Sequence, residues 1–285
     1  MPVRLRIRAP LEWGVEPVPA EHRILRGIDF FVLWSSLGVG LLVLVAGSLL
    51  VPGLGLLEAL LISLAGSLIG SLMLSSAGLV GSRYGVPTMV SLRPVLGIMG
   101  SYLPTALNIL QLVGWTAFEL MIMGQAASSI SGRFLGEFTH AFWVAVFAAW
   151  CAGLAIGGPL AFVRKWLERV AIWLVYFSAI WITVQVFSSP KVFARSGDGS
   201  LPILLALDLV IAMPISWWPL ISDYNRFSSM VRGGFIGTFL GIYDGEYLVL
   251  FPRGRAHFCH GHLGYNSLNI PSASRKSRAA IHPRG

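Results

Sequence analysis

Long apolar segments separated by short polar stretches make up most of the chain after residue 27. Six of these segments meet or exceed the roughly 20 residues that an α-helix needs to cross the hydrocarbon core of a bilayer. They lie near residues 28–50, 54–80, 100–130, 139–161, 168–188 and 201–221. The pattern therefore predicts an all-α membrane protein with six transmembrane helices.

The sixth segment is interrupted by a proline. Proline inside a helix removes one backbone hydrogen bond and clashes with the preceding turn, so the helix is expected to break or kink near Pro214. Lipid offers no partner for the freed backbone groups, and secondary transporters place their substrate at broken helices of this kind. Ser216 and Trp217 follow the break, and Asp208 precedes it. We expect Asp208 to be buried, which favours a substrate site over a kink that only shapes helix packing.

The first segment carries small residues in its first half, among them Ser35, Ser36, Gly38 and Gly40. Glycine and serine in the middle of a span weaken the helix and expose backbone carbonyl oxygens, which are the ligands that a coordinated cation needs. We therefore expect the backbone at Gly38 and Gly40 to contribute to a cation site. Close packing between helices through small residues is the alternative.

The third segment carries polar side chains on one face. Gln111, Trp115 and Glu119 follow one another at intervals of four residues, with Asn108 one turn earlier beside them. An acidic residue at mid-membrane costs roughly 2.5–3.5 kcal/mol on insertion scales, so such a residue usually has a function. An indole, an amide and a carboxyl group on one face suit a flat polar heterocycle, through stacking and hydrogen bonds. The alternative is that Trp115 only packs and that a neighbouring helix holds Glu119 protonated.

Composition agrees with a membrane protein. Hydrophobic residues make up 55% of the chain and charged residues 12%, and the mean hydropathy is +0.72, which excludes an ordinary soluble domain. The net charge of +8 comes from short loops and the tail, so we expect no nucleic-acid partner.

Twelve basic residues fall on one side of the predicted membrane and only Arg133, Lys191 and Arg195 on the other. This asymmetry predicts a multi-pass protein of the cell membrane with a cytoplasmic N-terminus.

Patterns typical of enzymes and metal sites are missing from the sequence. It contains neither H-E-x-x-H nor G-x-S-x-G. The cluster of His257, Cys259, His260 and His262 does not have the ligand spacing of a structural zinc site. We therefore expect no catalytic residue, no bound metal and no cofactor other than a coupling ion, Na⁺ or H⁺.

Several motifs in the same order as in a known family extend over much of the chain. They are Leu33-Trp34, the loop from Gly81 to Gly85, the helix from Leu107 to Thr116, and the stretch from Ser216 to Phe227. In these motifs the chain, from about residue 17 to 241, resembles the nucleobase:cation symporter family, and within it the cytosine and hydroxymethylpyrimidine permeases. The resemblance implies a five-plus-five inverted-repeat fold of the leucine-transporter type. It also implies symport of a nucleobase or related pyrimidine with Na⁺ or H⁺ across the bilayer.

The same resemblance implies roles for most of the candidate residues. Trp115 would stack on the substrate ring, with Gln111 on the same face, and Glu119 would hydrogen-bond the ring. Ser216 and Trp217 would form the opposite wall, and backbone near Gly38 and Gly40 would contribute to the cation site. Relatives often carry a neutral residue at position 119, so the glutamate leaves the exact substrate and the coupling ion open.

The pattern divides the chain into three parts. Residues 1–27 form a cytoplasmic N-terminal segment, 28–241 a partial transmembrane domain, and 242–285 a polar, basic tail that we expect to be disordered. Residues 28–241 supply the first repeat and only the start of the second, so we expect a truncated form in which transport is incomplete. The alternative is a non-transporting membrane fragment that needs a second polypeptide carrying the remaining helices.

Overall fold

A computed structural model describes residues 13–132, 135–156, 172–187 and 196–260. Every secondary-structure element assigned there is a helix, apart from an isolated β-bridge between Leu25 and Ser228. The α-helices are α1 (Gly27–Gly38), α2 (Leu41–Leu49), α3 (Leu56–Tyr84), α4 (Thr88–Ser91), α5 (Arg93–Gly100), α6 (Tyr102–Ser131), α7 (Thr139–Ile156), α9 (Ile172–Phe187), α10 (Ile203–Ile215), α11 (Ile221–Asn225) and α12 (Val231–His260). Short 3₁₀ turns are η1 (Ala20–His22), η2 (Gly136–Phe138) and η5 (Trp218–Leu220).

Three helical stretches among the described residues are long and apolar enough to cross a membrane: α3, α6 and the stretch from Ile203 to Asn225. A fourth crossing results if α1 and α2, which meet at a 60° bend, form one broken span. The predicted count of six is therefore not reached in this part of the chain. The predicted spans at 139–161 and 168–188 overlap α7 and α9, but their ends include residues 157–171 and 188, which lie outside the described residues.

Acidic side chains near the start of two spans explain why those helices begin where they do. The backbone N–H of Arg26 donates to Asp29 Oδ2 at 2.8 Å, and that of Gly55 donates to Glu58 Oε2 at 2.9 Å. Each carboxylate thus satisfies a backbone donor that the helix leaves unpaired. At the other end of α3, Gly85 takes φ +74°, the left-handed conformation in which glycine ends a helix at little cost.

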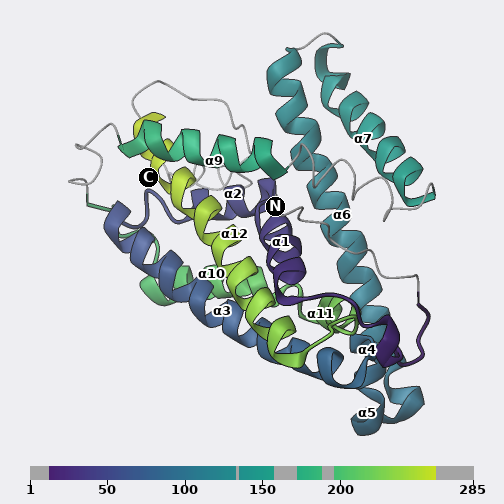
Figure 1. Cartoon of the computed structure of the whole chain (residues 1–285). Coiled ribbons are helices and arrows are strands. Elements are labelled where there is room, and N and C mark those ends of the chain that lie inside the picture. Colours follow the sequence, from purple (N-terminus) through teal and green to yellow (C-terminus); the bar gives the residue numbers. More distant parts are fainter. Residues whose placement is uncertain (1–12, 133–134, 157–171, 188–195, 261–285) are drawn as a thin grey trace, which may run out of the picture.

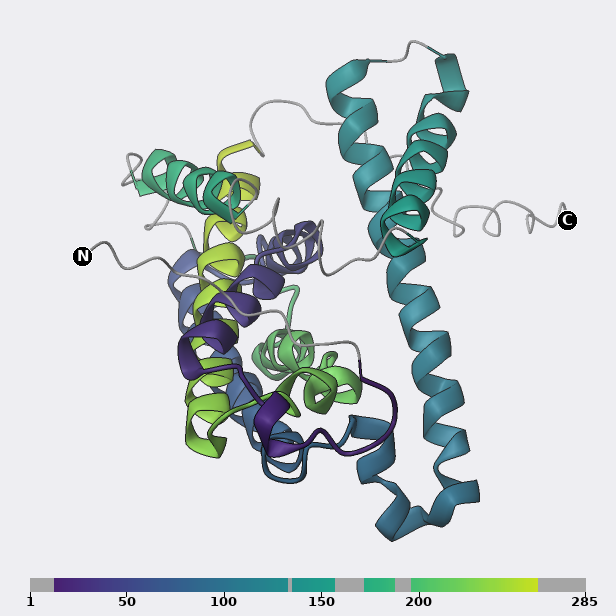
Figure 2. The same cartoon turned by 45° about the vertical axis from the view of Figure 1, so that its right-hand side comes forward.

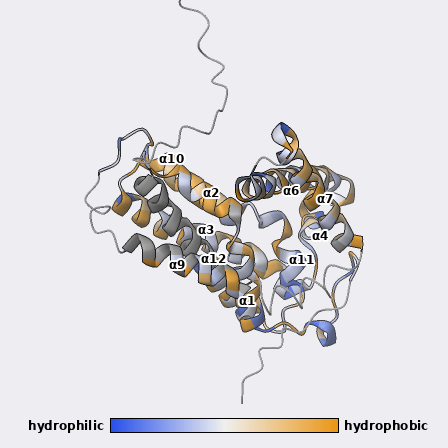
Figure 3. Cartoon of the chain, turned by 90° about the horizontal axis from the view of Figure 1, so that it is seen from above, coloured by the Kyte–Doolittle hydropathy of each residue, from blue (hydrophilic) through white to orange (hydrophobic). Residues whose placement is uncertain are grey.

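The helices form two groups (Figures 1 and 2). The first is a bundle in which α12 packs against α1, α2, α3 and α9, while α10 packs against α3. The second is the antiparallel pair of α6 and α7, which stands beside the bundle; α6 contacts α2 of the bundle and also α5, the short helix that precedes α6 in the chain. Seen from above, much of the ribbon of α2 and α10 is hydrophobic (Figure 3), and these two helices share a core with α3.

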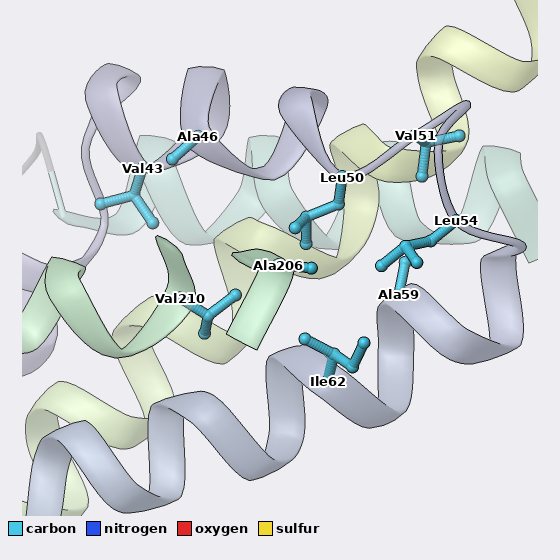
Figure 4. Close-up of a cluster of buried hydrophobic side chains, with 9 residues drawn as sticks. All are labelled: Val43, Ala46, Leu50, Val51, Leu54, Ala59, Ile62, Ala206 and Val210. Atoms are coloured by element: carbon cyan, nitrogen blue, oxygen red, sulfur yellow. The ribbon is translucent and has the colours of Figure 1, made fainter. Parts of the chain in front are cut away.

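One hydrophobic core joins α2, α3 and α10 (Figure 4). Its buried members are Val43, Ala46, Leu50, Val51, Leu54, Ala59, Ile62, Ala206 and Val210. Glycines on α3 allow the close approach: a Cβ atom at Gly66 would lie 2.6 Å from Val210 Cγ1, and one at Gly70 would lie 2.7 Å from Pro214 Cγ. The proline of α10 is therefore part of the helix interface with α3.

Asp208 is exposed, so the prediction that it is buried is wrong. The residues of α10 that face α3 are Ala206, Val210 and Pro214, spaced by four. Asp208 lies two residues from Ala206 and from Val210, a rotation of about 200° around the helix. The packing of α10 on α3 therefore turns Asp208 outward.

A second core fixes the N-terminal segment against the helix ends. Buried Trp34, Phe30, Leu74 and Ile221 belong to it. Arg226 donates from Nη1 to the carbonyl of Gly14 at 2.6 Å and from Nη2 to that of Trp13 at 2.9 Å. Burial lowers the pKa of the Arg226 guanidinium, and the nearby carboxylate of Asp223 opposes that shift. These contacts tie the chain before α1 to the end of α11.

Helix α12 crosses the predicted domain boundary at residue 241. It continues to His260, although the sequence predicted that order ends near Gly241. Glycines spaced by four explain the first turn of this continuation: Cβ atoms at Gly241 and Gly245 would lie 2.6 Å from Phe31 O and 2.7 Å from Ser35 O, so both positions pack against the backbone of α1. Residues 261–285 of the predicted tail lie outside the described residues.

Candidate substrate site

The site begins with a contact between α6 and the interrupted span. Gln111 Nε2 donates a hydrogen bond of 2.9 Å to the backbone carbonyl of Ser216. These residues lie 105 positions apart in the sequence, and both were predicted to bind substrate. The contact brings the polar face of α6 against the end of α10.

The interruption of the sixth segment follows the proline. The α-helix α10 includes Pro214 and ends at Ile215, and the chain then forms the 3₁₀ turn η5 before α11 begins. Trp217 N–H donates to Pro214 O at 3.1 Å, and Ser216 Oγ donates to Met213 O at 2.6 Å. The predicted break near Pro214 is thus confirmed, with local hydrogen bonds that satisfy part of the released backbone.

Trp217 is held by an aromatic cluster. Its ring meets that of Trp34 edge to face, with centroids 5.9 Å apart, and Trp34 meets Tyr224 at 5.5 Å. Trp34 is completely buried, and its indole Nε1 has no hydrogen-bond partner among the described residues. In the sequence Trp34 stands out only as part of a motif, because no pattern along the chain indicates that α1 supports Trp217.

Trp115 and Glu119 lie on the face of α6 that carries Gln111, and both are half-buried. In the described part of the chain, no hydrogen bond joins Glu119 to α10 or α11. Asn108, one turn before Gln111, has a buried Oδ1 atom without a partner among the described residues. The structure thus brings Gln111, Ser216 and Trp217 together, and leaves Trp115 and Glu119 further along the same face.

An apolar hollow lies on another side of α6. It is shallow and is lined by Ile109, Leu112, Val113, Thr116, Ala117 and Leu120. The hydroxyl of Thr116 is occupied by a bond of 2.8 Å to Leu112 O. A heterocycle with several polar atoms would find few partners there, so the face that carries Gln111 is the better substrate site.

The first span is also interrupted, as predicted. Helix α1 ends at the buried Gly38, Val39 is not helical, and Gly40 precedes α2 in an extended conformation. The last carbonyl groups of α1 have no partner within that helix, since it stops there. The carbonyl of Gly40 accepts the N–H of Leu44 at 3.1 Å. The break therefore leaves carbonyl oxygens at the end of α1 without helical partners, whereas that of Gly40 already accepts a hydrogen bond, and the cation site stays a prediction.

The sequence comparisons all match proteins of one class, the permeases. A family model described as "Permease for cytosine/purines, uracil, thiamine, allantoin" matches residues 17–252. A Bacillus subtilis protein, YxlA, whose name places it with the purine-cytosine permeases, is 26% identical over 220 residues, covering 75% of this chain and 46% of the relative. The allantoin permease of Bacillus subtilis is 22% identical over 254 residues, covering 79% and 51% respectively. The chain thus spans about half the length of these curated relatives.

A solved structure shares the fold. It is MHP1, a transporter of the nucleobase-cation-symport-1 family, in a closed conformation with bromovinylhydantoin bound. The TM-score is 0.70 at 15% sequence identity, and the match covers 86% of this chain and 58% of the other. At this identity the likeness shows the fold alone, which is all-helical in this chain.

Proposed function

Because the chain belongs to the family of permeases for cytosine/purines, uracil, thiamine and allantoin, we propose that it takes part in membrane transport of a nucleobase or related pyrimidine. The family is one of transporters and not of enzymes. Cytosine and hydroxymethylpyrimidine are the proposed substrates, and symport with Na⁺ or H⁺ is the proposed energy source. The chain would contribute the first repeat and the start of the second repeat of a five-plus-five fold.

The hydrogen bond between Gln111 and Ser216 carries this proposal. It places a polar helix face against an interrupted span, and broken helices at membrane depth are where secondary transporters bind their substrates. Trp115 offers a ring for stacking, and Glu119 and the buried Oδ1 of Asn108 offer acceptors for exocyclic amino groups. A flat heterocycle between α6 and Trp217 would use both aromatic and polar partners.

A binding measurement tests the proposal directly. The full chain in lipid nanodiscs should bind radiolabelled cytosine saturably, and unlabelled hydroxymethylpyrimidine should compete while a sugar of similar size should not. Uptake into proteoliposomes, with and without a Na⁺ or proton gradient, then tests whether this chain alone carries out symport or needs a second polypeptide with the remaining helices. If cytosine, hydroxymethylpyrimidine and a purine base all fail to bind at millimolar concentration, the proposed function is wrong.

The proposed orientation in the cell membrane has a cytoplasmic N-terminus. Loop residues Asp198 and Gly199 bond to the backbone of Pro52 and Gly53 at 3.0 and 3.1 Å, close to the start of α3. Arg83 lies in the last turn of that helix. The 29 residues of α3 span about 43 Å, more than the roughly 30 Å of the hydrocarbon core. The loop and Arg83 therefore belong on opposite sides of the membrane.

Cysteine labelling in intact cells measures this orientation. A thiol reagent that cannot cross the membrane should modify Ser196→Cys and leave Arg83→Cys unmodified, because basic loops remain in the cytoplasm. Both variants should react fully once the membrane is permeabilised, which controls for accessibility. The opposite pattern in intact cells would reverse the topology.

A further inference from the structure

A hydrogen-bonded cluster of three helices lies outside the substrate site. The hydroxyl oxygen of Tyr176 on α9 lies 2.6 Å from Ser35 Oγ on α1 and 3.3 Å from Asp244 Oδ2 on α12. Ser35 is buried, and Tyr176 and Asp244 are half-buried. Neither the substrate site nor the backbone cation site uses Tyr176 or Asp244.

Close helix packing builds this cluster into the fold. Gly245, the neighbour of Asp244, presses against α1, where its Cβ atom would lie 2.7 Å from Ser35 O and 3.1 Å from Gly38 Cα. Asp244 is thereby fixed beside the last turn of α1, at the point where the first span breaks. A change in the charge of Asp244 would therefore alter the electrostatic environment of the break in the first span.

Positive charges are absent around Asp244 in the described residues. Helix α12 packs against α1, α2, α3 and α9. The ionisable side chains of those four helices are Asp29, Glu58, Arg83, Tyr84 and Tyr176. Asp29 and Glu58 accept backbone N–H groups at their helix starts, and Arg83 and Tyr84 lie at the far end of α3. On α12 itself, Tyr243 is the other nearby ionisable residue whose side chain is described.

A carboxylate in such surroundings has one simple means of losing its charge. An ionised group withdrawn from water without a cation partner is costly, and binding a proton removes that cost. A hard metal cation would need a shell of several oxygen ligands, and the side chains of the cluster offer only one carboxyl group and two hydroxyls, so backbone carbonyls at the break of α1 would have to supply the rest.

The hydroxyl of Tyr176 can serve both protonation states. When Asp244 is ionised, Tyr176 donates to the carboxylate and accepts from the hydroxyl of Ser35. When Asp244 holds a proton, the carboxyl group donates to Tyr176, which donates to Ser35 Oγ. The two hydrogen bonds thus reverse direction together, because each hydroxyl is a donor and an acceptor.

We propose that Asp244, Tyr176 and Ser35 form a proton-binding site beside the break of the first span. A role for this proton as the coupling ion of transport rests on the proposed symport. The exchange is balanced: one proton enters from water and binds a carboxylate oxygen, and the same proton leaves when the site opens to the other side.

Infrared difference spectroscopy on the full chain in nanodiscs tests the site without transport. As the pH is lowered, the carboxyl signal of a protonated acid should appear, and its Asp244 component should be missing in Asp244→Asn. Asp208→Asn, on the exposed side of α10, is the matched control and should keep that component. Tyr176→Phe leaves the acid in place and should shift the midpoint of its titration by about one pH unit, because one hydrogen bond is lost.

Each result decides the proposal. Identical spectra for wild type and Asp244→Asn over the whole pH range would overturn it. An unchanged titration midpoint in Tyr176→Phe would overturn it as well. This second variant keeps the test decisive if Asp244→Asn does not fold. Replacement of K⁺ by Na⁺ at constant ionic strength should leave the midpoint in place; a shift would make this a sodium site. A chain that shows the Asp244 signal but binds no nucleobase would overturn the proposed function and leave the proton site standing.

Discussion

Replacement of Trp115 by alanine is expected to weaken cytosine binding by a factor of roughly 5 to 150. Stacking of one base on an aromatic side chain contributes roughly 1–3 kcal/mol with single-stranded nucleic acids, and we expect a similar contribution here. Trp115 shares its helix face with Gln111, which contacts the interrupted span. The measurement is the dissociation constant of radiolabelled cytosine for the full chain in nanodiscs.

Two further variants make this result specific. Trp115→Phe should bind more tightly than Trp115→Ala, because a smaller ring remains for stacking. Trp173→Ala removes an indole from α9 that is 66% exposed, and it should leave binding unchanged. Wild-type affinity in Trp115→Ala would remove this residue from the site.

Glu119→Gln keeps the shape of the side chain and removes its charge. If Glu119 only hydrogen-bonds the ring, the preference among cytosine, hydroxymethylpyrimidine and purines should change while the pH and Na⁺ dependence of binding stays the same. If Glu119 is the ion-coupled group, that dependence should change instead. Competition assays at several pH values separate the two roles.

Replacement of Gly241 by leucine is expected to destabilise the folded chain by roughly 2–3 kcal/mol. A Cβ atom there would lie 2.6 Å from the carbonyl oxygen of Phe31 and 3.0 Å from its Cα. Both atoms belong to the backbone of α1 and cannot rotate away, so α12 would have to separate from α1. The same displacement would move Asp244 away from Ser35.

Thermal unfolding of the detergent-purified protein, followed by size-exclusion chromatography, measures this effect. Gly153→Leu on α7 is the matched control, because a Cβ atom at Gly153 would have no other atom within 4 Å. Gly241→Leu should melt at a clearly lower temperature than wild type, and Gly153→Leu at the wild-type temperature. Equal melting of the two variants would show that α12 does not pack on α1 as described.

Local chemistry along the chain determined much of this protein. The length of the apolar segments identified a membrane protein. Pro214 and the small residues near Gly38 indicated the two interrupted spans. The four-residue spacing of Gln111, Trp115 and Glu119 indicated one polar helix face. These inferences succeed because they depend on the backbone of one helix and on the bilayer as solvent, both of which act over a few turns.

Only the tertiary structure decided which faces meet. It turned Asp208 outward, because α10 packs through Ala206, Val210 and Pro214 on the opposite side. It joined Gln111 to Ser216 across 105 positions, and it continued α12 past Gly241 through glycines that press on α1. A periodic pattern gives each helix a face but not its partner, since the partner depends on close packing between distant segments. The apolar segments therefore predicted where most of the helices form, and the shapes of their contacting surfaces decided how they assemble.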